Sequence, residues 1–249
     1  MNANTLQGRV ALVTGAGGTM GRAVVDALVA QGCRVGMLDL NREAMRAAEA
    51  QHGDAVLALG CDIGDEAAVT AAHAQLVRAL GRVDILVNNA GVLNNHKLAA
   101  TTASDWHRVM AANLDGALFL SQAVVPAMKE AGWGRIVNVS SLAAKTGGLT
   151  AGTAYSVSKG ALSALTFSLA RELAGFGVTT NAVAPAYVRT PMVTEQLDEA
   201  QRQALLKQIP VGRFCEPEEF AHVVCFLASP LSGFITGEVI DLNGGLLMD

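Results

Sequence analysis

Tyr155 and Lys159 are two side chains whose types and spacing allow shared chemistry. They stand four residues apart in YSVSK, at the start of a predicted helix, so both fall on one helix face. A phenol has an unperturbed pKa of about 10, and acid–base work near neutrality needs a shift of roughly three units, or about 4 kcal/mol in favour of the phenolate. The neighbouring ammonium and a bound cation could supply this shift. Taken alone, such a pair is more often part of a solvated helix face.

A glycine-rich turn, TGAGGTMG at residues 14–21, follows the first predicted strand and leads into a helical stretch. Because glycines carry no Cβ, backbone N–H groups and the positive end of the helix dipole can approach a pyrophosphate there. The glycines stand at positions 15, 17, 18 and 21, so the strict G-x-G-x-x-G pattern is absent. The turn indicates dinucleotide binding, and a merely tight strand-to-helix connection is the alternative.

Asp39 ends the second predicted strand, where a carboxylate can accept hydrogen bonds from the ribose hydroxyls of an adenosine. The same carboxylate would repel a 2′-phosphate, and the next residue is Leu40 rather than a cation. NAD is therefore the predicted cofactor in preference to NADP. Arg22 and Arg42 are cations near Asp39 in the sequence, so NADP is kept as the alternative cofactor.

The elements that must position these residues alternate between short β-rich apolar runs and longer stretches of helical periodicity. This alternation predicts an α/β fold, with one Rossmann-type domain over residues 1–249 and a doubly wound parallel sheet covered by helices on both faces. Seven strands are predicted, at residues 9–14, 34–40, 55–61, 84–89, 134–141, 177–185 and 237–244. The predicted helices cover residues 19–31, 41–51, 65–80, 104–131, 154–175, 192–208 and 217–228.

Several predicted helices begin with residues that favour a helix N-terminus. They are Asn41 with Glu43, Asp65 with Glu66, Ser104 with Asp105, and Pro217 with Glu218 and Glu219. Three more motifs fall near strand ends: NNAG at 88–91, Ser140 and Ser141 after the fifth strand, and NLDG at 113–116 in the long helix before it. All should converge at the carboxyl edge of one sheet, where a ligand crevice is expected.

Composition excludes several classes of function. The chain has 249 residues, 51% hydrophobic and 16% charged, with a net charge of -4 and no run of Lys or Arg, so neither nucleic acid nor an anionic membrane is an expected partner. No apolar run approaches the roughly 18 residues needed to cross a bilayer, and no basic region precedes a hydrophobic one at the start, so a cytoplasmic protein is expected. The four cysteines and five histidines are scattered, and no metal site is predicted.

At this point the sequence resembles the short-chain dehydrogenase/reductase family over essentially its whole length, with members such as 3-oxoacyl carrier-protein reductases and polyol or sugar dehydrogenases. Each matching motif is weak alone, but their joint order and spacing are specific. They are TGAGGTMG, Asp39, CDI at 61–63, NNAG, NLDG, NVSS, YSVSK, VAPAYVRTPM and TGEVIDLNGG.

The resemblance implies a catalytic role for four residues. Tyr155 would be the acid/base, and Lys159 would hold the nicotinamide ribose and lower the pKa of the phenol. Ser141 would orient the substrate oxygen, with Ser140 structural, and Asn113 would support a water-linked proton path. These roles agree with physical chemistry, because a proton donor must reach the reacting oxygen while the cofactor transfers hydride.

By the same resemblance, cofactor binding falls to Gly15, Met20, Gly21, Asp39, Asp62, Ile63, Asn89, Tyr155, Lys159 and Val188. Asp62 would face the adenine or merely cap the third strand, and Asn89 could instead only brace the sheet. Two residues depart from the family, which usually has glycine where Thr19 and Ala186 stand. Neither departure removes a catalytic group, so altered cofactor affinity is expected rather than loss of activity.

Substrate choice should come from three loops around the crevice, at residues 92–97, 142–153 and about 187–210, the last acting as a lid. Asn94, Asn95 and His96 in the first loop would suit a sugar or polyol, although turn residues are the plainer explanation. Small residues along the helix that carries Tyr155 leave a broad face to cover. A homo-oligomer is therefore favoured, and the resemblance suggests a tetramer.

The expected function is an NAD(H)-dependent oxidoreductase that interconverts a secondary alcohol and a ketone, acting on CH–OH groups. One alternative is an NADPH-dependent 3-oxoacyl carrier-protein reductase, against which Asp39 argues. An alternative of another class is a nucleotide-sensing protein on the same fold without turnover, against which the retained Ser, Tyr and Lys argue.

Overall fold

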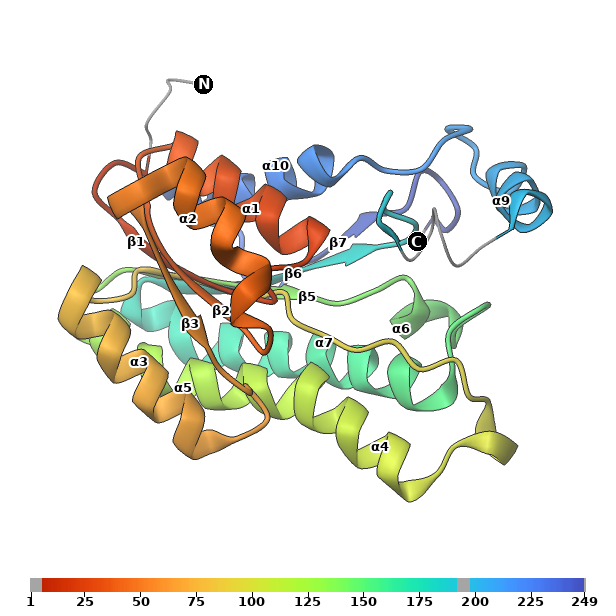
Figure 1. Ribbon diagram of the computed structural model, residues 1–249, viewed down its shortest axis with the longest axis horizontal. Helices are drawn as coiled ribbons and strands as arrows, with labels where there is room; N and C mark the ends of the chain where they lie inside the picture. Colours follow the sequence, from red (N-terminus) through yellow and green to blue (C-terminus); the bar gives the residue numbers. More distant parts are fainter. Residues whose placement is uncertain (1–5, 192–197, 249) are drawn as a thin grey trace.

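A seven-stranded parallel sheet lies at the centre of the computed structural model, which describes residues 6–191 and 198–248 (Figure 1). All seven predicted strands are confirmed, each within a few residues of its expected bounds. They are β1 (Val10–Thr14), β2 (Arg34–Asp39), β3 (Val56–Gly60), β4 (Ile85–Asn88), β5 (Gly134–Val139), β6 (Val178–Pro185) and β7 (Val239–Leu242).

The strand order is β3-β2-β1-β4-β5-β6-β7, and every neighbouring pair is parallel. The chain winds outward from β1 to β3 on one side and then from β4 to β7 on the other. Between β1 and β4 the connections leave in opposite directions, so a crevice opens there at the carboxyl ends of the strands. β1, β4, β5 and β6 are buried along their whole length, as central strands covered on both faces must be.

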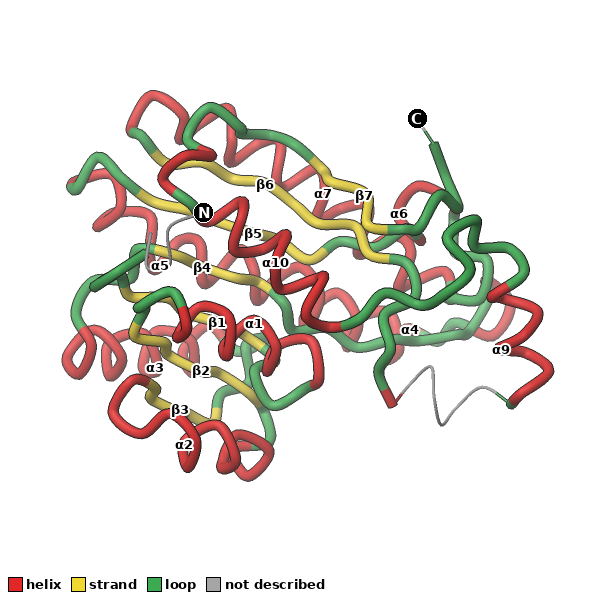
Figure 2. Tube along the Cα trace, turned by 90° about the horizontal axis from the view of Figure 1, so that it is seen from above, coloured by secondary structure: helices red, strands yellow, loops and turns green. Residues whose placement is uncertain are grey.

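Helices cover both faces of the sheet, as predicted (Figures 1 and 2). On one face lie α1 (Thr19–Ala30), α2 (Arg46–His52) and α10 (Pro217–Ala228), whose buried side chains share one apolar core. The other face carries α3 (Glu66–Leu80), α5 (Gly116–Glu130) and α7 (Thr153–Leu173), which enclose a second core. The sheet is thus held rigidly between two layers, and its carboxyl edge is a fixed platform for the site.

The long predicted helix at 104–131 is divided into three segments. α4 (Ala103–Met110) passes into a single π-helical turn, η4 (Ala111–Asp115), before α5 begins. α4 starts one residue earlier than expected because Thr102, not Ser104, is its N-cap: the Thr102 hydroxyl accepts the Asp105 N–H, and the Asp105 carboxylate accepts the Thr102 N–H. The π turn is the segment that carries the NLDG motif.

The combined run Ala103–Glu130 is long and apolar enough, by length and composition alone, to cross a bilayer. The sequence expectation that no run has this length was therefore wrong for this helix. Its α5 part packs on α3 and on β5, and its α4 part packs on α7, so here the run forms part of the helical layer under the sheet. The core helix of a globular fold passes the same test of length and hydropathy.

Other helical predictions differ in detail from the structure. The stretch at 41–51 is a 3₁₀ turn, η1 (Arg42–Met45), followed by α2, with the Asn41 side chain accepting the Glu43 N–H as expected. In the region predicted as a helix at 192–208, α9 covers Glu199–Leu206, and residues 192–197 lie outside the described part. Short segments were not predicted: α6 (Ala143–Thr146), η2 (Gly53–Ala55), η3 (Leu98–Ala100), η5 (Ala174–Phe176) and η6 (Pro230–Ser232).

Candidate active site

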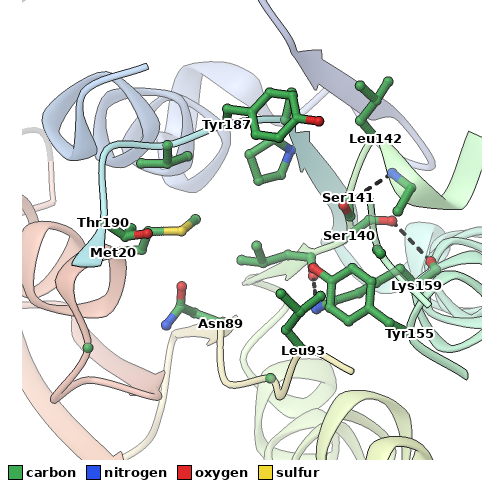
Figure 3. A pocket seen from close by; sticks show the side chains of 18 of the residues that line it. Met20, Asn89, Leu93, Ser140, Ser141, Leu142, Tyr155, Lys159, Tyr187 and Thr190 are labelled. Atoms are coloured by element: carbon green, nitrogen blue, oxygen red, sulfur yellow. Dashed lines mark hydrogen bonds between the residues drawn. The ribbon is translucent and has the colours of Figure 1, made fainter. Parts of the chain in front are cut away.

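A cavity of about 650 Å³ opens at the carboxyl ends of the central strands. Its wall comes from the turn after β1, the end of β2, the segments after β4, β5 and β6, and the first turns of α7. Figure 3 shows Met20, Asn89 and Thr190 on one side and Ser141 and Tyr155 on the other. Nine residues predicted for the site line this one cavity: Gly15, Met20, Gly21, Asp39, Asn89, Ser141, Tyr155, Lys159 and Val188.

The glycine turn forms one end of the cavity. Gly15 has a φ of +62°, a left-handed conformation that favours glycine. At Gly21, a Cβ would overlap the carbonyl oxygen of Gly15, so the first turn of α1 can pack on the turn only because that atom is missing. The N-cap Gly18 makes no side-chain cap, and the first backbone N–H groups of α1 lie beside the cavity. This is an arrangement that suits a phosphate group.

Asp39 lies at the same end of the cavity and is fixed by the backbone. One carboxylate oxygen accepts the Gly17 N–H at 2.9 Å, and the other accepts the Asn41 N–H at 2.9 Å. The carboxylate is therefore held in one orientation between the glycine turn and the end of β2. An ionised group in this place can accept further hydrogen bonds from hydroxyl groups and repels anions.

Asn89 braces the sheet and also faces the cavity. Its amide nitrogen donates to the carbonyl oxygens of Thr14 at 2.8 Å and Gly15 at 3.3 Å, which ties the end of β4 to the glycine turn. The Thr14 hydroxyl accepts the N–H groups of Asn89 and Ala90 at 3.0 and 2.9 Å. The bracing role that the sequence left open is thus present, together with a place in the lining (Figure 3).

Lys159 and Tyr155 stand one turn apart on α7 and border the cavity together. Lys159 is only 3% exposed, and its ammonium donates to the carbonyl oxygen of Val139 at 2.7 Å. The ammonium nitrogen is 5.8 Å from the centre of the Tyr155 ring. Burial lowers the pKa of Lys159 from 10.5 to about 8, since removing the ammonium from water disfavours its charged form.

Burial also governs the phenol. It raises the pKa of Tyr155, and a side-chain hydrogen bond with Ser141 acts in the opposite direction as a smaller effect. Burial therefore favours the neutral phenol, and a positive charge beside the ring would favour the phenolate.

The two serines after β5 differ in their surroundings (Figure 3). The Ser140 hydroxyl bonds to the carbonyl oxygen of Lys159 at 3.0 Å and to the hydroxyl of Ser163 at 2.8 Å, which fastens β5 to α7. Ser141 accepts the Ala143 N–H at 3.1 Å and is hydrogen-bonded with Tyr155. Ser141 therefore lies next to the phenol, and Ser140 is engaged behind it.

Asn113 is buried in the π turn, behind the cavity wall rather than in its lining. Its side-chain oxygen accepts the Val92 N–H at 2.7 Å, and its nitrogen donates to the Val92 carbonyl at 3.1 Å and to the Ser158 hydroxyl at 3.0 Å. A Cβ on Gly91 would lie 3.2 Å from both the Asn113 oxygen and the Lys159 nitrogen. Asn113 thus secures the chain after β4 close to Lys159.

Asp62 and Ile63 also lie outside the cavity lining. Asp62 is exposed, and its carboxylate accepts the Gly64 N–H at 2.9 Å, as a turn residue does after β3. Ile63 is buried, and its side chain lies against Gly116 at the start of α5. The structure therefore does not bring these two residues into the cavity with the others.

The half of the cavity beyond Tyr155 is formed by loops. Asn95 is the one residue of the Asn94–His96 group that lines it. Asn94 is buried and donates to Asp105 at 3.1 Å, and the His96 ring bonds to Asp105 at 3.0 Å, so both serve the loop itself. The hydrogen bonds from Thr102 and His96 lower the pKa of Asp105 to about 2.

Some lining residues were not singled out individually by sequence reasoning: Leu93, Leu142, Leu149, Tyr187, Thr190 and Pro191. All fall within the three loops assigned to substrate choice. Apolar residues in otherwise polar loops are the signal that could have marked Leu93 and Leu149.

Thr19 and Ala186, the two departures from the family pattern, both line the cavity as well. Over the described residues, no three His, Cys, Asp or Glu side chains gather as a metal site would require.

Comparison with known proteins gives consistent matches over nearly the whole chain. The family model for enoyl-(acyl carrier protein) reductase matches residues 15–247. The chain is 40% identical to a 2-dehydro-3-deoxy-L-rhamnonate dehydrogenase (NAD(+)) of Sphingomonas sp. (strain SKA58), covering 96% of this chain and 95% of the relative. It is also 40% identical to a 3-oxoacyl-(acyl-carrier-protein) reductase of Pseudomonas aeruginosa, with 98% and 99% covered.

Similarity extends to three dimensions. A crystal structure of a short-chain dehydrogenase/reductase, described as a glucose/ribitol dehydrogenase from Brucella melitensis, matches with a TM-score of 0.89. That protein is 32% identical to this chain, and the match covers 100% of both. With the fold, the glycine turn and the Tyr155–Lys159 pair at one cavity, these matches show that the chain belongs to the short-chain dehydrogenase/reductase family, oxidoreductases that bind a nicotinamide cofactor and act on small molecules.

Proposed function

We propose that this protein is an NAD(H)-dependent oxidoreductase that interconverts a secondary alcohol and a ketone, with Tyr155 as the acid/base. The observation that carries the proposal is the placement of Tyr155, Ser141 and Lys159 on the same cavity as the glycine turn and Asp39. One end of the cavity suits a phosphate and a ribose, and the other end presents a phenol that can exchange a proton.

The fit of a dinucleotide rests on two features of the chain. The missing Cβ at Gly21 and the left-handed Gly15 leave the backbone N–H groups of α1 accessible for a pyrophosphate. Asp39 offers a fixed carboxylate to ribose hydroxyls. When bound, a nicotinamide dinucleotide supplies the hydride acceptor or donor. Met20, Asn89 and Val188 complete the cofactor side of the cavity. We assign Asp62 and Ile63 to the adenine end, although neither lines the cavity.

The proton steps belong to side chains of this protein. In alcohol oxidation, Tyr155 accepts the hydroxyl proton of the substrate, and in ketone reduction it returns a proton to the carbonyl oxygen. Ser141 donates a hydrogen bond to the same substrate oxygen and keeps it beside the phenol. Lys159 places its ammonium near the phenol and favours the phenolate over the phenol. Asn113 supports a water-linked proton path by holding the chain around Val92.

The preference for NAD over NADP is supported by what surrounds Asp39. Arg42 binds both carboxylate oxygens of Glu49, at 2.7 and 2.8 Å. Arg22 binds Asp26 at 2.9 Å and also donates to the side chain of Gln51. Both arginines that left NADP open are thus engaged with other side chains, and neither lines the cavity. A 2′-phosphate would meet the Asp39 carboxylate without one of these cations to balance it.

The test is a screen of reduced-nicotinamide absorbance over polyols, sugars, hydroxy acids, steroids, simple secondary alcohols and acyl thioesters, with NAD(H) and with NADP(H). We expect turnover of a secondary alcohol with a higher kcat/KM for NAD. Tyr155→Phe should then lower kcat by about 10²–10⁴-fold, the usual contribution of a positioned proton donor.

Tyr187→Phe is the matched control, because it removes the other phenol of the same cavity. It should keep kcat within about tenfold of the wild type, below the smallest effect of a lost general acid. Activity largely unchanged in Tyr155→Phe would overturn the proton-transfer assignment.

A second candidate, an NADPH-dependent 3-oxoacyl carrier-protein reductase, is favoured by the relative of that name. It predicts that an acetoacetyl thioester with NADPH is the best pair in the screen. A nucleotide-sensing protein without turnover would bind a nucleotide and convert nothing in either direction. The same screen therefore separates all three.

The proposed assembly is a homotetramer in the cytoplasm. α5 and α7 expose apolar side chains on the outer side of their layer, among them Leu118, Val157 and Phe167. Exposed apolar side chains of this kind are what a second copy of the chain would cover in a symmetric interface.

A further inference from the structure

Two segments form the wall of the cavity beyond Tyr155. The first follows β4 and contributes Leu93 and Asn95, and the second follows α6 and contributes residues 148–151. In Figure 1 the yellow chain after β4 runs beside the green segment between α6 and α7. The distance between these segments sets the width of the cavity, so whatever joins them controls the space open to a substrate.

Part of the connection is made by the backbone. The Gly152 N–H donates to the carbonyl oxygen of Asn94 at 2.8 Å, and the Thr153 N–H donates to that of His96 at 3.0 Å. The segments approach so closely that a Cβ at Gly152 would overlap both of these carbonyl oxygens. The junction therefore ends at the first turn of α7, two residues before Tyr155.

The remaining connection is made by Lys97. Its ammonium donates to the carbonyl oxygen of Gly148 at 2.7 Å and to that of Ala151 at 2.6 Å. In the part of the chain that the structure describes, no other hydrogen bond holds residues 148–151. Hydrogen bonds from an ionised donor are shorter and stronger than neutral ones, so one side chain can hold the whole turn.

Lys97 is itself fixed to its own segment. Its carbonyl oxygen accepts the N–H groups of Ala100 and Thr101 at 2.9 and 3.0 Å, and the Thr101 hydroxyl at 3.0 Å. The residue does not line the cavity, although Gly148 and Ala151 do. Lys97 is exposed, and its ammonium acts on the cavity through the backbone that it binds.

We propose that Lys97 is a positioning residue that holds residues 148–151 in place and so sets the shape of the substrate half of the cavity. The inference rests on the proposed function for what enters the cavity, but the structural part can be tested without any substrate. It predicts that removing the ammonium loosens the junction, weakens substrate binding and leaves nucleotide binding intact.

The first experiment is hydrogen exchange of the full-length protein, comparing wild type with Lys97→Met. The amides of Gly152 and Thr153 should exchange about tenfold faster in the variant, because a charge-assisted tether beside their acceptors is lost. Lys97→Arg keeps a cationic donor and should restore most of the protection. Lys129→Met, which removes an ammonium on α5 outside the cavity lining, is the matched control and should leave both amides unchanged.

The second experiment is kinetic and uses cyclohexanol and D-threitol as probes with NAD. Lys97→Met should raise the KM for the alcohol about tenfold and keep kcat within about twofold, with the Kd of NAD unchanged. Gly152→Ala should produce the same KM effect with Lys97 still present, because the added Cβ drives the two segments apart. Lys97→Arg should lie near the wild type.

Three results would overturn the proposal: unchanged exchange at Gly152 and Thr153 in Lys97→Met, faster exchange spread equally over the core strands, or a KM and a Kd of NAD that rise together. If neither probe is turned over by the wild type, the kinetic arm bears on the proposed function, and the exchange arm still decides the role of Lys97.

Discussion

At the scale of single residues, burial changes the chemistry that a side chain can perform. Lys159 is buried on α7 and donates to the carbonyl oxygen of Val139, and its burial lowers the pKa of the ammonium. Its ammonium is therefore costly to the folded state and available to whatever enters the cavity. A lysine retained under these conditions serves the site more than the stability of the fold.

Lys159 should consequently leave a signature in the pH dependence of stability. The folded protein releases the proton near pH 8, whereas the unfolded chain retains it up to about 10.5. Between these values the unfolded state binds more protons, so the free energy of unfolding rises with pH. In urea denaturation, the wild type should gain about 3 kcal/mol relative to Lys159→Met between pH 7 and pH 10.5.

Lys129→Met, which removes an ammonium outside the cavity lining, provides the reference for that experiment. The ammonium of Lys129 pairs with Glu172 and lies over the Phe176 ring, so this variant controls for the loss of one lysine elsewhere in the same helical layer. A difference between the wild type and Lys159→Met that does not change with pH would mean that the ammonium of Lys159 is not desolvated.

At the scale of elements, the glycine turn and α1 act as one unit. The first turn of the helix packs on the turn through the missing Cβ of Gly21, and this contact presents the N–H groups of α1 to the cavity. The N-cap Gly18 belongs to the same motif but is not crowded, since a Cβ there would meet only the Gly15 carbonyl oxygen, at 3.5 Å. Close packing against Gly15 therefore requires a glycine at position 21 but not at position 18.

Substitution of each glycine by alanine should therefore affect NAD binding to different extents. Gly21→Ala should weaken NAD binding about 100-fold or more, because the overlap with Gly15 forces the helix away from the turn. Gly18→Ala should change the Kd less than about threefold, since its φ of -80° suits alanine. Nucleotide titration by fluorescence measures both, and equal effects would show that the contact between Gly21 and Gly15 is not decisive.

The π turn in the middle of the predicted helix at 104–131 positions one side chain behind the cavity wall. It carries Asn113, whose amide group binds both backbone groups of Val92 and the hydroxyl of Ser158. A π turn interrupts the regular helical ladder and is often found at functional sites. Here it joins the segment after β4 to α7, the helix of Tyr155 and Lys159.

At the scale of the whole molecule, the helical layer that contains α5 and α7 exposes apolar side chains to solvent. Val157 and Phe167 on α7 are 44% and 51% exposed, and Leu118 on α5 is 36% exposed. α7 also carries Tyr155 and Lys159, so a partner covering its outer side would stiffen the helix that holds the proton donor. Assembly and catalysis would then depend on opposite sides of one element.

The proposed assembly can be tested at this surface. Phe167→Asp combined with Val157→Asp should reduce the particle mass at least about twofold by light scattering, because two desolvated carboxylates cannot be accommodated in an apolar interface. Val77→Asp places one carboxylate at an exposed position of α3 and should leave the mass unchanged. An unaltered mass in the double variant would exclude this face as the interface.

The sequence by itself determined the alternation of strands and helices, the glycine turn, Asp39 and the Tyr155–Lys159 spacing, because periodicity, backbone freedom and i, i+4 geometry are local properties. Helix caps are also local features. Asn41 was predicted correctly as an N-cap, whereas the N-cap of α4 is Thr102 rather than Ser104, with Asp105 as its capping-box partner.

Contacts between segments distant in sequence select which polar residues reach the cavity. Asn94 and Asn95 are neighbours of one type, yet Asn94 is turned to Asp105 and Asn95 lines the cavity. Asp62, Ile63 and Asn113 matched the motifs but lie outside the lining, and Lys97 had no motif at all. The physical reason is that a side chain's direction and partners depend on segments distant in sequence, such as residues 148–151 for Lys97, and pattern along the chain does not contain those contacts.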